Sequence, residues 1–308
     1  MNTNQIFGFA ALLLGTLVSG TTHAACSYND PSVSLSIRSP GSNAGVVVGT
    51  ARISASVTPG TSSGSSSSSS CNSFASTSSS IYIDNRYIGS GQVDYNTNQF
   101  ADGTHIVRVD ASDSNGGRAS VQQRIDIRNN WIRGEIYNLS DYVALNPDVA
   151  NAFGGNPDRT LSHWLQFGIR EGRQANLFFS SREYAENNGD IAAAFGADWP
   201  RIVDHYIVFG INERRTTLFA LRGEVYNVHD YYARHGDLQA AFPGDVVAVT
   251  RHWLQFGVNE GRRGVSNFSP ATYMQRHGDL QNAFGATNYA AGIRHYLQYG
   301  LSEGRSGN

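Results

Sequence analysis

Two stretches decide the fold of the carboxyl-terminal part of this sequence: WIRGEIYNLSD at residues 131–141 and ALRGEVYNVHD at residues 220–230. They begin 89 residues apart, so residues 131–219 and 220–308 are two copies of one block. Self-similarity at a fixed period indicates a repeat architecture, in which each unit buries its apolar face against its neighbours. We therefore expect each block to be a helical repeat pair.

Each block divides again into two units with a common spacing of Tyr, Asp and Phe. In every unit a Tyr stands six residues before an Asp, and a Phe stands five residues after it. The Asp residues are Asp148, Asp190, Asp237 and Asp279, the Tyr residues are Tyr142, Tyr184, Tyr231 and Tyr273, and the Phe residues are Phe153, Phe195, Phe242 and Phe284. A unit of about 42 to 47 residues cannot bury its own apolar face, whereas four stacked units can.

A second segment of each unit reads His-aromatic-x-x-aromatic-Gly, followed by Glu and Arg. Its residues are His163, His205, His252 and His295, then Glu171, Glu213, Glu260 and Glu303, then Arg173, Arg215, Arg262 and Arg305. Apolar residues fall at i, i+3, i+4, i+7 and i+8, as in Leu161, Trp164, Leu165, Gly168 and Ile169. This period predicts one face of an amphipathic helix.

The Tyr-to-Phe segment is predicted to form two short helices broken at Asn-Pro, Asn-Gly or His-Gly. Asn or Gly suits a left-handed helix end, and the Asp that follows suits the next N-cap. Arg214 replaces the Gly of the Glu-Gly-Arg sequence in the second unit. We therefore expect that unit to end its last helix differently.

The pattern of Tyr, Asn-Pro-Asp-Val, His-aromatic-x-x-Phe-Gly and Glu-Gly-Arg resembles repeats of secreted or envelope-associated bacterial proteins. The resemblance covers residues 138–305 and implies a module rather than one fixed activity. Four Asp–His pairs invite a metal or catalytic interpretation. A capping Asp and a His bonded to a neighbouring turn would recur for packing reasons, so we interpret the repeated Asp, His, Glu and Arg as structural, with Glu and Arg tying each unit to the next.

Residues 26–128 are predicted to form an all-β sandwich. Short alternating segments such as Val33, Leu35 and Ile37 are separated by Gly-, Pro- and Asn-containing turns. IYIDNRYIG at 81–89 and DGTHIVRVDASDSNGG at 102–117 resemble bacterial Ig-like domains. A serine-rich insertion at residues 58–80 is expected to be a flexible loop.

Residues 1–25 are predicted to be a signal peptide, because a short apolar run is followed by small residues. The mature protein would then be secreted, either periplasmic or on the cell surface. The two cysteines, Cys26 and Cys71, are expected to form a disulfide in an oxidising compartment. A lipid anchor on Cys26 is the less favoured alternative, and no later segment is apolar enough to span a membrane.

The charge pattern excludes several function classes. The formal net charge is −2 and all 23 basic residues are Arg, which argues against a nucleic-acid partner and against Schiff-base chemistry. The Gly60-to-Gly64 stretch matches a nucleophile-elbow pattern only by serine content. We predict no catalytic residue, no metal site and no cofactor.

Aromatic residues outside the periodic helix face are the remaining functional candidates. Trp164 and Trp253 belong to that face and are expected in the core, whereas Trp131, Trp199 and Tyr232 are candidates for an exposed ligand-binding platform. Packing is the alternative interpretation for these three side chains.

Three hypotheses for function follow. The first is a non-catalytic binding or adhesion protein that recognises a polysaccharide, an envelope component or a protein partner, and it predicts exposed aromatic residues. The second is a structural component of the cell envelope, which predicts a large apolar patch. The third is an unrecognised glycan hydrolase, which predicts two carboxylates about 5 to 10 Å apart in a cleft.

Overall fold

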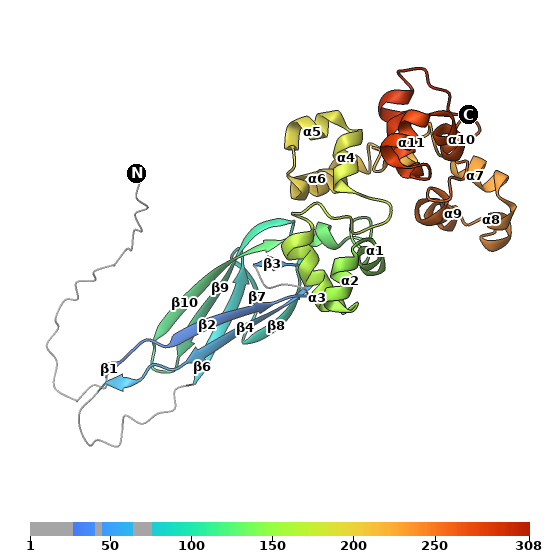
Figure 1. The fold of residues 1–308 in the computed structure, drawn as a ribbon. Coiled ribbons are helices and arrows are strands. Elements are labelled where there is room, and N and C mark those ends of the chain that lie inside the picture. The colour runs from blue at the N-terminus through green and yellow to red at the C-terminus, as the bar shows by residue number, and fades with distance from the viewer. Residues whose placement is uncertain (1–26, 41–44, 64–75) are drawn as a thin grey trace, which may run out of the picture.

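The structure is a computed structural model that describes residues 27–40, 45–63 and 76–308. A β domain is followed by an α domain of short helices, as Figure 1 shows from blue to red. This confirms the predicted multidomain order of a sandwich and a helical array. The predicted signal peptide, Cys26 and Cys71 lie outside the described residues. In the described part of the chain, no helix is long and apolar enough to cross a membrane.

The β domain packs two sheets face to face. The strands of the three-stranded sheet are, in order, β2 (Ser32–Arg38), β4 (Thr50–Thr58) and β8 (Gln92–Asn96). Those of the five-stranded sheet are β3 (Val46–Val47), β10 (Arg118–Ile127), β9 (Gly103–Asp113), β6 (Thr77–Ile83) and β7 (Arg86–Gly89). Ile53 of one sheet and Ile81, Val107 and Ile125 of the other are 0–2% exposed in one cluster. The period-two pattern placed them correctly, because alternate strand residues face the opposite sheet.

Part of the serine-rich insertion is strand rather than loop. Residues 77–80 begin β6 and pair with β9, in the register Thr77↔Asp113 to Ser80↔Asp110. The pair Ser62–Ser63 forms β5 and pairs with β1 (Ser27–Tyr28). Backbone hydrogen bonds to a neighbouring strand order these residues although their small side chains bury little apolar surface. The serine-rich composition alone therefore predicted too long a loop.

The α domain consists of four units of three short helices, each closed by a π-helical turn. Unit 1 holds α1 (Leu139–Leu145), α2 (Pro147–Phe153), α3 (Pro157–His163) and the turn Trp164–Gly168, and unit 2 holds α4 (Ser181–Asn187), α5 (Gly189–Phe195), α6 (Trp199–His205) and Tyr206–Gly210. Unit 3 holds α7 (Val228–Arg234), α8 (Gly236–Ala241), α9 (Val246–His252) and Trp253–Gly257, and unit 4 holds α10 (Pro270–Arg276), α11 (Gly278–Phe284), α12 (Tyr289–His295) and Tyr296–Gly300.

The break between the first two helices of a unit differs from the expectation. Asn146 precedes α2 with φ −130° and ψ 80°, outside the left-handed region. Asp148 is the second residue of α2 and not its N-cap. Its carboxylate binds an arginine, as described below, so the predicted capping role of the four repeated Asp residues is wrong.

The repeated Tyr, Gly and His residues form the centre of each unit. Tyr231 is fully buried, and its hydroxyl lies against the Cα of Gly257 and 3.0 Å from the Nδ1 atom of His252. A Cβ atom on Gly257 would come within 2.3 Å of that hydroxyl. The same contact recurs at Gly168, Gly210 and Gly300. The final Gly of the repeat motif is therefore required by a buried hydroxyl.

The second unit ends its last helix as the other three do, contrary to the sequence expectation. Arg214 adopts φ +54°, close to the +64° to +65° of Gly172, Gly261 and Gly304 at the equivalent positions. Left-handed backbone is costly for a side chain with a Cβ atom. The surrounding turn thus imposes a left-handed backbone conformation on Arg214 although the residue carries a Cβ atom.

In units 2, 3 and 4 the residue directly before the repeated His binds a side chain outside its own unit. Arg251 of unit 3 donates to Asp141 of unit 1 at 2.8 Å, and Arg294 of unit 4 pairs with Glu183 of unit 2 at 3.0 Å. At the same position in unit 2, Asp204 accepts a hydrogen bond from the Trp131 indole at 3.0 Å. Units 3 and 4 therefore lie against units 1 and 2.

The sandwich joins unit 1 through the short 3-10 helix η2 (Asn129–Ile132). Asp102, just before β9, accepts the backbone N–H groups of Asn129 and Asn130 at 2.9 and 2.8 Å. Val46 and Val48 of the sandwich share a buried cluster with Trp131 and the first two units. Helices α1 to α3 accordingly lie beside the β3 end of the sandwich (Figure 1).

We expect Gly257→Ala to lower the free energy of unfolding by about 2 kcal/mol, because the new methyl group overpacks the Tyr231 hydroxyl. Urea denaturation would measure the loss. Gly236→Ala, in the same unit with open space around it, should change stability by less than about 1 kcal/mol. Adding Tyr231→Phe should recover part of the Gly257→Ala loss. Strict additivity of the two changes would contradict the assigned contact.

We expect Arg214→Gly to raise the free energy of unfolding by up to about 1 kcal/mol, since glycine adopts positive φ without strain. The reverse change, Gly304→Arg, places a side chain at the matching turn of unit 4, where space is open, and should be destabilising by a similar amount. Opposite signs in denaturation midpoints support the assignment, and equal signs oppose it.

Candidate functional site

Each unit exposes one large aromatic side chain on its π-helical turn. The exposed fractions are 53% for Phe167, Phe209 and Phe256 and 55% for Tyr299. All four stand directly before the glycine that contacts the buried tyrosine. Large apolar side chains exposed at the same position of every repeat are unusual for a packing role. These four residues are the candidate functional residues, and we call them the turn aromatics.

Two further rings continue each turn aromatic into a row. In unit 1 the His163 ring lies 5.7 Å from Phe167 and 5.6 Å from Phe153 between ring centroids. The other rows combine Phe195, His205 and Phe209; Phe242, His252 and Phe256; and Phe284, His295 and Tyr299. The repeated His thus has a buried edge, which meets the tyrosine hydroxyl, and lies between two aromatic side chains.

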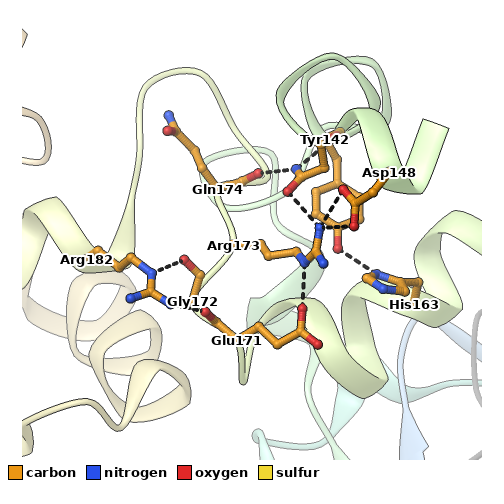
Figure 2. Close-up of polar contacts among 9 residues, drawn as sticks. Tyr142, Asp148, His163, Glu171, Gly172, Arg173, Gln174 and Arg182 are labelled. Carbon is orange, nitrogen blue, oxygen red and sulfur yellow. Dashed lines mark hydrogen bonds and ion pairs between the residues drawn. The ribbon is translucent and has the colours of Figure 1, made fainter. Parts of the chain in front are cut away.

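Carboxylates and an arginine lie next to each row. In unit 1, Arg173 donates from Nη1 to Asp148 at 2.8 Å and from Nε to Glu171 at 2.6 Å, while Tyr142 meets His163 at 2.8 Å (Figure 2). Arg215, Arg262 and Arg305 bind the matching Asp and Glu of their own units. The prediction that Glu and Arg tie one unit to the next is wrong, because the arginine instead joins both ends of a single unit.

The network fixes the protonation of its members. The hydrogen bond from Arg173 lowers the pKa of Asp148, and the equivalent arginines lower the pKa of Asp190, Asp237 and Asp279. Burial lowers the pKa of His163, His252 and His295. Burial also raises the pKa of the partner tyrosines, to about 12 for Tyr184 and Tyr273. At neutral pH the rows of units 1, 3 and 4 therefore hold a neutral imidazole, and in all four units an ionised Asp is paired with an Arg.

The Asp–His pairs considered from the sequence bind different partners. Asp148 binds Arg173, whereas His163 binds the hydroxyl of Tyr142. Among residues 27–40, 45–63 and 76–308, no group of three or more His, Cys, Asp or Glu is arranged to hold a metal ion. The arrangement suits noncovalent contact with a ligand, through exposed rings flanked by fixed hydrogen-bonding groups.

The three aromatic residues named from the sequence lie in packed surroundings. Trp131 is 3% exposed, and its ring lies against the guanidinium groups of Arg128 and Arg170. It therefore cannot serve as an exposed platform. The expectation failed because Trp131 lies at the domain junction, where burial does not follow the helix period.

Trp199 and Tyr232 are half-buried. The Trp199 ring lies under Arg182, 4.7 Å from its guanidinium carbon, and against Gly172. The hydroxyl of Tyr232 accepts the backbone N–H of Gly244 at 3.1 Å. Both side chains hold neighbouring turns together. Trp164 and Trp253 are in the core, at 2% and 0% exposure, as the helix period predicted.

The turn aromatics were present in the sequence pattern but were not singled out. Phe167 stands four residues after His163 and between the buried positions Leu165 and Gly168. A large aromatic that recurs off the apolar face in every copy is the signal that would have identified it.

Comparisons with known proteins show only distant similarities. No family model matches, and no curated protein matches. Among solved structures, fibronectin(III)-like modules of Clostridium thermocellum CbhA align at 16% identity and TM-score 0.22, covering 32% of this chain and 46% of that one. A polysaccharide lyase aligns at 13% identity and TM-score 0.19, covering 88% and 40%. The chain thus spans less than half the length of either structure.

We expect stability to fall as the pH drops below about 6.5. Histidines with a lowered folded-state pKa bind fewer protons in the folded protein than in the unfolded one, so acid favours unfolding. A further loss should follow below about pH 4, where the paired Asp carboxylates become protonated. Urea midpoints between pH 8 and pH 3 measure both steps. A variant with His163, His252 and His295 changed to Gln should show a flatter profile between pH 8 and 5, and an unchanged profile contradicts this assignment.

Proposed function

We propose that this protein is a noncatalytic, multivalent binding module whose ligand is a polysaccharide. The observation that carries the proposal is the fourfold repetition of an exposed aromatic side chain on a fixed turn. Repetition of one contact at four places suits a ligand that itself repeats. A polysaccharide presents the same ring many times along one chain, whereas most protein surfaces do not.

The chemistry of each row suits a sugar ring. The C–H face of a pyranose packs on an aromatic ring, and its hydroxyl groups need donors and acceptors at the ring edge. The turn aromatic provides the face. Two carboxyl groups and an arginine lie nearby and pair with one another, as Asp148, Glu171 and Arg173 do in unit 1. Little side-chain entropy is lost on binding because these groups already hold one another.

Four weak contacts on one folded array produce strong retention. When one unit has bound, the others meet the same polymer at a high effective concentration, so overall affinity can exceed that of a single row by about 10²- to 10⁴-fold. The Ig-like assignment of the sandwich is supported by its three-stranded and five-stranded sheets. In this proposal it is a spacer that presents the array, and the protein acts outside the cytoplasm.

The test is retention of the purified mature protein on insoluble polysaccharides, namely cellulose, xylan, chitin and isolated peptidoglycan. A variant with Phe167, Phe209, Phe256 and Tyr299 changed to Ala should lose at least about tenfold of its apparent affinity, since four contacts act together. Each single change should cost less. Because the four side chains are more than half exposed, the variant should unfold at nearly the urea concentration of the unchanged protein.

A matched control is Tyr87→Ala, which removes an aromatic side chain of 57% exposure from strand β7 of the sandwich. It should leave retention unchanged. Equal losses from Tyr87→Ala and from the fourfold variant would place binding elsewhere or show nonspecific adhesion. Absence of retention on all four materials would overturn the proposal and favour a structural role in an assembly.

A further inference from the structure

A cleft of ≈630 Å³ lies between the sandwich, the short helix η2 and unit 2. The loop before β9 and the start of η2 form one side, and α6 with its π-helical turn forms the other. The lining includes Phe100, Asp102, Arg128, Arg133, Asp204 and Val208. Junctions between domains are common places for ligand clefts of this size.

The charges of the cleft are already compensated. Arg128 binds Asp126 at 2.9 Å and lies 3.6 Å from Asp204, and Arg133 binds Glu135 at 2.8 Å. An anionic ligand would have to compete with these carboxylates, and a cationic ligand with the arginines. A neutral ligand that both donates and accepts hydrogen bonds meets no such competition.

The lining also combines polar edges with an apolar surface. Amides of Asn98 and Asn130 and the carboxylate of Asp204 supply donors and acceptors, while Phe100 and Val208 supply apolar contact. Burial raises the pKa of the Asp204 carboxyl group. Apolar surface with a few placed polar groups is characteristic of small-molecule sites, and a sugar ring presents both kinds of surface.

Val208 departs from the repeat pattern at this place. Units 1, 3 and 4 carry Gln166, Gln255 and Gln298 at the same position, directly before the turn aromatic. Val208 is 51% exposed and belongs to the cleft, and the turn aromatic Phe209 follows it. Thus the unit that lines this cleft has an apolar side chain where the other three have an amide.

We propose that this junction cleft binds a short segment of a neutral oligosaccharide, separately from the four aromatic rows. The choice of a sugar rests in part on the proposed function, whereas the position and neutrality of the ligand rest on the lining. Binding and not hydrolysis is proposed. Hydrolysis of a glycosidic bond needs two carboxyl groups that act on the substrate. Asp204 is one such group, but both oxygens of the neighbouring Asp102 already accept backbone N–H groups.

The indole N–H of Trp131 provides a local reporter, because it donates to Asp204 on the wall of the cleft. The full chain would be labelled with ¹⁵N and titrated with cellotetraose, xylotetraose, mannotetraose and N-acetylchitotetraose, with spermidine and tetragalacturonate as charged probes. At least one neutral tetrasaccharide should shift the Trp131 indole resonance saturably.

Val208→Trp fills the cleft and should weaken that binding at least tenfold. Gln255→Trp places the same side chain at the equivalent position of unit 3 and should leave it unchanged. A variant with Phe167, Phe256 and Tyr299 changed to Ala should keep the tetrasaccharide titration even where it loses retention on insoluble polymer. These two readouts separate failure of the cleft from failure of the rows.

Three results would overturn the inference. A shift produced only by spermidine or only by tetragalacturonate would show that the cleft takes an ion. An indole resonance that none of the six probes shifts would show that the cleft takes none of these chemistries. Equal weakening by Val208→Trp and Gln255→Trp would place the tetrasaccharide on the rows.

Discussion

Every unit of the α domain depends on one contact, in which a buried tyrosine hydroxyl packs against a glycine. The tyrosine of the first helix reaches the π-helical turn, where only a hydrogen atom on the glycine leaves room for it, and its oxygen meets the imidazole. A π-helical turn widens the backbone by one residue and re-aims the side chains beside it. The aromatic before the glycine is thereby directed into solvent while the glycine itself is buried. The π-helical turn therefore accounts both for the buried tyrosine–glycine contact and for the exposure of the turn aromatic.

Complementary charge, placed at one position of the repeat, decides how units meet. Asp204, Arg251 and Arg294 each stand directly before a repeated histidine. The carboxylate of Asp204 accepts from the Trp131 indole, and the two arginines pair with carboxylates of units 1 and 2. Arg251 reaches a carboxylate on unit 1, which is 5% exposed and which also accepts a backbone N–H. A buried carboxylate left without these donors would be costly, so the docking geometry is specific.

Much of the architecture could be predicted from periodicity. The order of domains, four units of three helices, and the buried Trp164 and Trp253 all followed from spacing, because apolar periods report which side of an element is covered. Periodicity did not reveal contacts between residues far apart in the chain, or backbone conformations imposed by a turn. Trp131 is buried by a junction, Arg214 takes a backbone conformation imposed by its turn, and Asp148 reaches an arginine 25 residues away. Phe167 lies off the predicted apolar face, and its exposure could have been inferred from that position because the same position is aromatic in every unit.

The pairing of unit 3 with unit 1 and of unit 4 with unit 2 has a mechanical consequence. The ion pairs Arg251–Asp141 and Arg294–Glu183 join residues 110 and 111 positions apart in the chain. A force that separates the two blocks therefore acts on both ion pairs in parallel and not on one after the other. A solenoid held only by nearest neighbours can be pulled apart one repeat at a time. Here, tension between the sandwich and the last unit is shared by both pairs, and separation of the blocks requires both to break together. A protein anchored at one end and attached to a polymer along the other would resist detachment by shear in this way.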